Sequence, residues 1–136
     1  MYLPNRGGVM IASEILFWIY LVNSVLLINH EIDSAYWKEW ELFKLPGGIT
    51  GFLLIHIPLI FFVLYGLVLV FQQSITGLLF SLVLSFAGIF AFTAHMYFIR
   101  KGRDEFKMPI SLFILVSTLI VSLTQAVLTI HLMINW

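Results

Sequence analysis

Four long apolar stretches, separated by short polar connections, make up most of this chain. They cover residues 9–29, 49–71, 75–99 and 110–134. Each is long enough to cross the hydrocarbon core of a bilayer as a helix, which takes about 20 residues. Because backbone polar groups in lipid must satisfy one another, helix is the expected conformation. The pattern predicts an all-α, integral membrane four-helix bundle, with residues 1–136 forming a single membrane domain.

The connections between these stretches differ in length and charge. Residues 72–74 are so few that the second and third spans must form an antiparallel hairpin. By the positive-inside rule, the face that carries the other two connections is cytoplasmic, and both termini lie on the non-cytoplasmic side. Six of the seven basic residues support this orientation: Lys38, Lys44, Arg100, Lys101, Arg103 and Lys107.

The connection between the first and second spans has a helical pattern of its own. Apolar residues recur at helical spacing from Ile32 to Phe43, with charged residues between them. The sequence LPGG at residues 45–48 would end such a helix. We therefore expect a short amphipathic helix over residues 34–44, lying at the membrane interface. Its interfacial anchors would be Tyr36, Trp37 and Trp40.

Composition supports a membrane protein and removes several kinds of function. The chain is 61% hydrophobic and 10% charged, with a mean hydropathy of +1.03, which leaves too little polar surface for a soluble fold. The zero net charge gives no electrostatic basis for binding nucleic acid. The absence of cysteine excludes disulfides, thiolate metal sites and thiol redox chemistry. The expected partners are the lipid bilayer and either a homo-oligomer or a larger membrane complex.

Polar residues that can carry chemistry are concentrated near the first connection. Residues 29–48 hold four of the seven acids, besides His30. His95 lies five residues before Arg100, and His56 lies about two turns into the second span. Three histidines from three different spans are therefore expected on the cytoplasmic side of the membrane.

These histidines and acids are candidates for a metal site. Asp33 shares a helix face with His30, and a bend beyond the first span would instead fold Glu39 or Glu41 back over the helix ends. Imidazole nitrogens and one carboxylate are typical ligands of zinc, or of nonhaem iron where coordination positions stay open. A metal-bound water would then attack a lipid or other apolar substrate. The predicted metal ligands are His30, His56, His95 and Asp33, and the predicted catalytic carboxylates are Glu41 and Asp33.

The same residues allow other interpretations. No compact ligand motif such as HExxH occurs, and histidines near the ends of membrane helices often form hydrogen bonds to neighbouring helices. The chain would then be a non-enzymatic structural or accessory subunit of a membrane assembly. A channel or transporter is a third interpretation, which would need a homo-oligomer because four spans are few for a pore.

Two further polar pairs are predicted within the spans. Glu14 and His131 fall at a similar depth on the non-cytoplasmic side. Since an intramembrane carboxylate needs a partner or a role, we expect these two residues to form a structural polar pair. Gln125 lies near the middle of the fourth span, and Asn23 of the first span is its expected hydrogen-bond partner.

One stretch resembles a known family. The runs HEID at residues 30–33 and WKEWELF at residues 37–43 are similar to the H-E-[MIL]-D…E-W signature of an uncharacterised family of small bacterial multispanning membrane proteins. The resemblance implies that this stretch carries the function and that the chain resides in a bacterial inner membrane. It implies no reaction and no cofactor. The residues that match are His30, Glu31, Asp33, Glu39 and Trp40.

Overall fold

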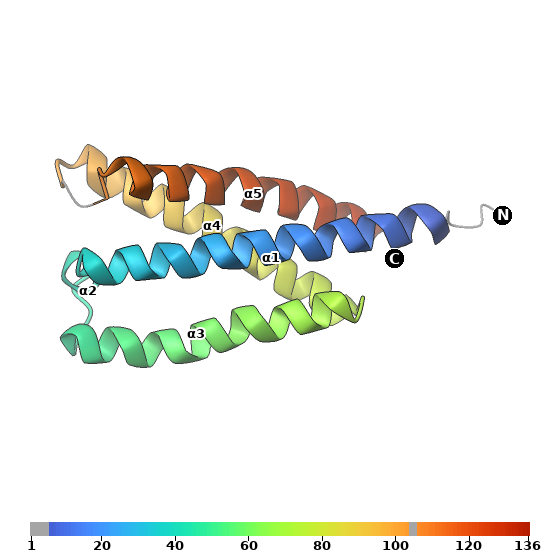
Figure 1. The fold of residues 1–136 in the computed structure, drawn as a ribbon, viewed down its shortest axis with the longest axis horizontal. Coiled ribbons are helices and arrows are strands. Elements are labelled where there is room, and N and C mark those ends of the chain that lie inside the picture. Colours follow the sequence, from blue (N-terminus) through green and yellow to red (C-terminus); the bar gives the residue numbers. More distant parts are fainter. Residues whose placement is uncertain (1–5, 104–105) are drawn as a thin grey trace.

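Four long helices and one short helix form the part of the protein that the structure describes. The computed structural model describes residues 6–103 and 106–136. The four long helices are all long and apolar enough to cross a membrane, which confirms the predicted all-α membrane bundle. In chain order, the helices are α1 (Arg6–Tyr36), α2 (Glu39–Leu42), α3 (Gly48–Phe71), α4 (Ile75–Arg100) and α5 (Pro109–Ile134) (Figure 1).

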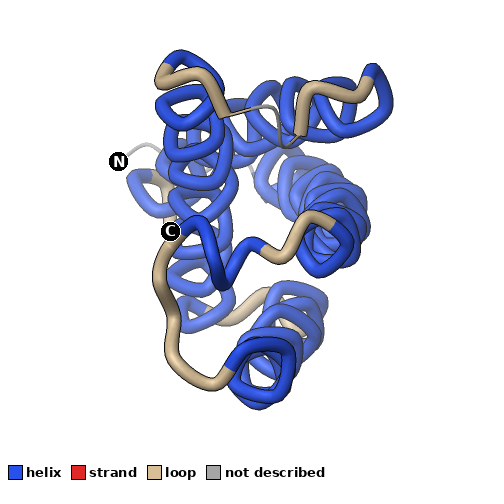
Figure 2. The backbone as a smooth tube through the Cα atoms, turned by 90° about the vertical axis from the view of Figure 1, so that its left-hand side faces the viewer, coloured by secondary structure: helices blue, strands red, loops and turns tan. Residues whose placement is uncertain are grey.

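The long helices form a bundle in which each packs mainly against two neighbours, with a smaller contact between α1 and α4. Helix α1 packs against α3 and α5, and α4 packs against the same two helices. Figure 2 shows the four long helices roughly end-on. We call the end where α1 and α4 finish the site end, and the opposite end, which carries the α3–α4 turn, the hairpin end (Figure 1).

The tight turn between α3 and α4 confirms the predicted hairpin. Helix α3 ends at Phe71 and α4 begins at Ile75. The Ser74 hydroxyl caps α4 by accepting a hydrogen bond from the Gly77 amide at 3.0 Å. A Cβ atom at Gly77 would overlap the backbone of Leu69. Glycine at this position therefore lets the two helices approach closely where the hairpin closes.

A buried polar network joins α1, α4 and α5 in the middle of the bundle. Asn23 Nδ2 donates a 2.8 Å hydrogen bond to Gln125 Oε1, which confirms the partner predicted for Gln125. Gln125 Nε2 donates to the carbonyl and the hydroxyl oxygens of Ser81, both at 3.0 Å. The hydroxyl oxygens of Ser81 and Thr129 lie 2.7 Å apart. Because these side chains are fully buried, their hydrogen bonds fix how the three helices pack.

The connection between α1 and α3 differs from the predicted interfacial helix. Nothing between residues 30 and 36 breaks a helix, so α1 continues to Tyr36 instead of ending near residue 29. The separate helix α2 spans only Glu39–Leu42. Lys38 and Lys44 flank it in left-handed conformations, with φ of 53° and 54°. The chain therefore reverses on both sides of α2, and α2 folds back towards the ends of the long helices.

Candidate metal centre

Three side chains from three helices converge at the site end of the bundle. They are His30 of α1, Glu39 of α2 and His95 of α4, and one ligand atom from each lies within 4.8 Å of the other two. The two imidazole rings are nearly perpendicular, with centroids 4.6 Å apart. His30 is 2% exposed and His95 is 1% exposed. Within residues 6–103 and 106–136, no other group of three histidines and acids has spacing that suits a metal ion.

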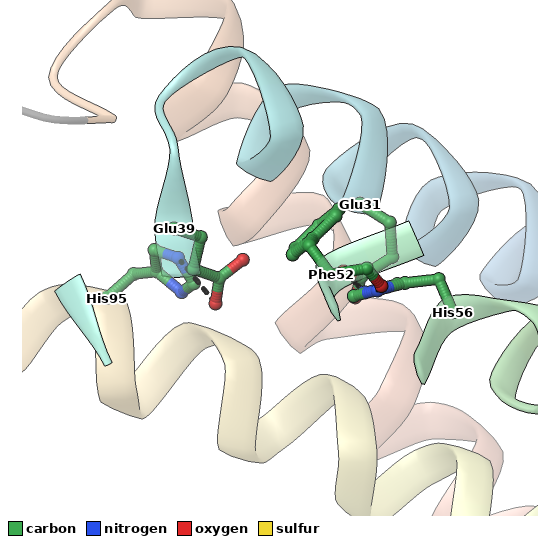
Figure 3. A network of polar contacts seen from close by, with 5 residues as sticks. All are labelled: Glu31, Glu39, Phe52, His56 and His95. Carbon is green, nitrogen blue, oxygen red and sulfur yellow. Dashed lines mark hydrogen bonds and ion pairs between the residues drawn. The ribbon is translucent and has the colours of Figure 1, made fainter. Parts of the chain in front are cut away.

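The backbone reversal at Lys38 brings Glu39 into this cluster. Lys38 has φ 53° and ψ 51°, and Glu39 is the first residue of α2 immediately after it. His30 and His95 lie on the buried faces of their helices, close to the site end. The carboxylate therefore folds back onto two imidazoles that the long helices already hold side by side. Figure 3 shows the Glu39 carboxylate beside the ring of His95.

Hydrogen bonding determines which nitrogen of His95 faces the cluster. His95 Nδ1 lies 2.7 Å from the carbonyl oxygen of Ala91, and because a carbonyl only accepts, Nδ1 carries the proton. In the neutral ring, Nε2 therefore keeps its lone pair. This nitrogen lies 3.7 Å from Glu39 Oε1, beyond the length of a normal hydrogen bond. A backbone hydrogen bond to the far nitrogen is the usual support of a metal-binding histidine.

Several buried polar atoms near the cluster have no hydrogen-bond partner within the described residues. Two of them, His30 Nδ1 and His95 Nε2, belong to the cluster itself. Two further atoms also lack a partner: Asp33 Oδ2, one turn beyond His30 on α1, and Trp37 Nε1, just after the end of α1. Buried polar groups without partners are rare and destabilise a fold by about 1–3 kcal/mol each. The donor set therefore fits a bound ion, which would satisfy imidazole nitrogens that the protein leaves unpaired.

Aromatic side chains enclose the cluster. Phe106, just before α5, is buried, and its ring centroid lies 4.0 Å from that of His95 and 6.1 Å from that of His30. Its φ of 68° lies in the left-handed region, which bulky residues rarely adopt. The Phe43 ring lies 6.4 Å from His95, centroid to centroid. This apolar shell limits the access of water and strengthens electrostatic interactions within the cluster.

His56 forms a separate pair with Glu31 instead of joining the cluster. His56 Nε2 lies 2.6 Å from Glu31 Oε2, and His56 Nδ1 lies 2.6 Å from the carbonyl oxygen of Phe52 (Figure 3). Because the carbonyl only accepts, Nδ1 carries a proton, and a second proton lies between Nε2 and the carboxylate. Both nitrogens of His56 are therefore already engaged.

The remaining predicted site residues lie outside the cluster. Asp33 lies one turn beyond His30 on α1, but its carboxylate is not among the converging atoms. The Glu41 side chain is 63% exposed and lies 3.9 Å from Lys38 Nζ. Glu14 and His131 are exposed on the outer surface of the bundle. Since no hydrogen bond or ion pair joins Glu14 to His131 in the described structure, the predicted polar pair does not form there.

The family to which the chain belongs follows from a comparison of the whole sequence with family models. Residues 16–132 match the model of DUF6713, a family of unknown function. The chain belongs to this family. No curated protein and no solved structure matches the chain. The matched range contains all three residues of the cluster, as well as Glu31 and His56.

Two acids with partners in the structure of this DUF6713 chain, Glu39 and Glu31, were not among the metal ligands or catalytic residues predicted from the sequence. Glu39 was one of two carboxylates that a bend would bring over the helix ends. In the structure it is the first residue of α2, directly after the left-handed Lys38, and its carboxylate meets the cluster, whereas Glu41 is exposed. Glu31 follows His30 directly and so points in a different direction on α1. This difference in direction indicates that the two side chains contact different helices: His30 contacts His95 of α4, and Glu31 contacts His56 of α3.

The cluster has the chemistry of a transition-metal site. Two imidazoles and one carboxylate occur in zinc enzymes that keep a position open for water or substrate. The same ligand set binds Fe(II) in nonhaem oxygenases. In the DUF6713 chain, the three ligands come from three helices, so binding an ion would fasten α1, α2 and α4 together at the site end.

Proposed function

We propose that this DUF6713 protein is a small integral membrane protein that binds one divalent transition-metal ion at His30, Glu39 and His95, and that this centre acts on a lipid or other apolar substrate. The observation that carries the proposal is the convergence of three ligand atoms within 4.8 Å. Two ligands that are each about 2.0–2.1 Å from one ion lie roughly 3–4 Å apart. The distance of 3.7 Å between His95 Nε2 and Glu39 Oε1 fits that spacing.

Each residue of the cluster would have a distinct task. The two neutral imidazoles would bind the ion through their lone pairs, and the Ala91 carbonyl would hold His95 in the required tautomer. The Glu39 carboxylate would offset part of the positive charge. Phe106 would exclude bulk water from one side. Zinc or iron is the ion that this ligand set favours, and either would supply Lewis acidity towards a polar group of the substrate.

The orientation of the centre follows from the charges at the site end. Lys38, Lys44, Arg100 and Lys101 lie at the ends of α1 and α4 and beside α2. Because cytoplasmic connections carry an excess of basic residues, these charges support a site end at the cytoplasmic face of the membrane, with both termini on the other side. A bacterial inner membrane is the location that we propose.

Metal analysis of the purified protein tests the centre directly. We expect about one equivalent of zinc or iron per chain, and a lower thermal stability after chelation because an ion bound only to the folded state stabilises it. Glu39→Gln should lose most of the metal, whereas the matched control Glu41→Gln, in an exposed carboxylate of the same helix, should retain it. Less than about a tenth of an equivalent in the parent protein, with unchanged stability after chelation, would overturn the proposal.

A purely structural ion is a second candidate, favoured by the burial of both histidines and by the aromatic cover over them. The two roles differ in whether a coordination position is open. Azide added to the cobalt(II)-substituted protein should change its visible absorption if a position is open. An unchanged spectrum, together with stabilisation by the ion, would support the structural role.

A further inference from the structure

A pocket lies between α1, α3 and α4, and Glu31, the neighbour of His30 in the sequence, forms part of its lining. Helices α3 and α4 meet at the hairpin end and diverge towards the site end (Figure 1). The pocket between them has a volume of about 170 Å³. Its lining is apolar except at Glu31 and His56, and it includes Leu27, Leu59, Val63, Val83, Leu84 and Ala87.

The pocket opens towards the bilayer. Leu59 on α3 and Val83 on α4 line it, and about half of each side chain is exposed. Both helices are long and apolar enough to cross a membrane, and in that position the surface between them faces lipid chains. The volume is close to the ~150 Å³ of apolar cavities that bind one small hydrocarbon. It therefore has room for one segment of a single chain, whose remainder would extend into the bilayer.

The polar end of the pocket offers one free hydrogen-bonding atom. Both nitrogens of His56 are engaged, and Glu31 Oε2 is engaged by His56. No residue in the described part of the chain donates a hydrogen bond to the other oxygen, Glu31 Oε1, and the side chain is 31% exposed. This oxygen accepts a hydrogen bond whether the shared proton lies on Glu31 or on His56. A bound head group must therefore be a donor, and an anionic one would meet the carboxylate of Glu31.

We propose that this pocket binds a neutral single-chain lipid with a terminal hydroxyl, such as a long-chain alcohol or a monoacylglycerol. The chain lies against the apolar lining, and the hydroxyl donates a hydrogen bond to Glu31 Oε1. If this lipid is also the apolar substrate of the metal centre, that part of the inference rests on the proposed function. As a binding site it depends only on the pocket and the Glu31–His56 pair, so it is tested without reference to the metal.

Photochemical crosslinking tests the pocket. The probe is a long-chain alcohol with a diazirine in its chain, added to the full-length protein in phosphatidylcholine nanodiscs, with adducts mapped by mass spectrometry. We expect adducts on the pocket-facing residues of α3 and α4. Unlabelled oleyl alcohol should compete at least about tenfold better than its methyl ether or oleic acid, a difference of roughly 1.4 kcal/mol in binding.

Matched variants separate the pocket from the general lipid-facing surface. Ala87→Trp fills the pocket and should reduce labelling, whereas Leu79→Trp, at an exposed position of α4 outside it, should not. Glu31→Leu should abolish the preference for the hydroxyl. Glu31→Gln should retain it, because the amide can donate to a neutral His56 and leave its oxygen facing the pocket. If Ala87→Trp does not fold, Val83→Phe serves the same purpose.

Each outcome decides the inference. Uniform labelling of all lipid-facing helices, without competition, would mean adventitious surface lipid only and would overturn it. Equal competition by the fatty acid, or better competition by a long-chain amine, would overturn the assignment of the head group. Specific labelling of a protein that contains no metal would support the pocket while the proposed metal centre fails. One equivalent of metal per chain without labelling of the pocket would support the proposed metal centre and overturn the lipid site.

Discussion

The Nε2 atom of His56 lies 2.6 Å from Oε2 of Glu31, within hydrogen-bond distance. The same ring also contacts the Phe52 carbonyl through Nδ1, so His56 could bind a metal only by giving up one of these partners. We predict that His56→Ala leaves the metal content of the DUF6713 protein near that of the parent. His95→Ala should reduce metal affinity by at least about tenfold, since it removes a ligand. Metal analysis of both purified variants checks this.

The exposed His131 supplies the control for this comparison. His131→Ala should match the parent in metal content, because His131 lies near the hairpin end, away from the cluster. An equal loss of metal in His56→Ala and His95→Ala, with both variants folded, would contradict the division into a metal cluster and a separate Glu31–His56 pair.

The buried polar network of Asn23, Ser81 and Gln125, which joins α1, α4 and α5, should contribute to stability but not to metal binding. Gln125→Leu removes hydrogen bonds to Asn23 and Ser81 and leaves buried polar atoms unpaired. We expect it to lower the free energy of unfolding by about 1–3 kcal/mol, measured by denaturation in detergent micelles. The Thr124 hydroxyl bonds only to its own helix, at Ile120 O, so Thr124→Val should change stability much less. Equal effects of the two substitutions would show that the network does not hold the helices together.

The bundle was predictable because its determinants lie close together in the sequence. The length of each apolar stretch indicates a membrane span, and residues 72–74 are too few for anything but a hairpin. The Asn23–Gln125 contact also follows from position, since both side chains fall at similar depth in apolar helices and each needs a partner.

The site was only partly predictable because it depends on backbone turns and helix rotation. His30 and His95 meet, but the choice of Glu39 depends on a left-handed lysine, which no sequence rule indicates. His56 was expected among the ligands from its depth alone, whereas its direction around α3 pairs it with Glu31. No local pattern marks Phe106 as the cover over His95, because its ring packs against histidines of α4 and α1 that lie elsewhere in the sequence.

The aromatic cover formed by Phe106 should control how fast the ion exchanges. Phe106→Ala removes the ring that lies 4.0 Å from His95 and admits water to the cluster. We predict that the metal is lost to a chelator about tenfold faster than from the parent, the size of effect typical of residues that surround a metal site. Phe90→Ala, which removes an exposed phenyl ring from the same bundle, is the matched control and should exchange at the parental rate. Equal rates in all three proteins would mean that Phe106 does not limit access.

The proposed orientation can be tested with introduced cysteines because the natural chain has none. Lys101→Cys places a thiol at the exposed end of α4, at the site end, and Gln72→Cys places one in the exposed α3–α4 turn at the hairpin end. If the basic connections face the cytoplasm, a membrane-impermeant maleimide applied to intact spheroplasts should label Gln72→Cys at once. Lys101→Cys should react only after the membrane is permeabilised. The opposite pattern would place the proposed metal centre at the outer face of the membrane, where it would meet the ions of the external medium instead of the buffered cytoplasmic pool.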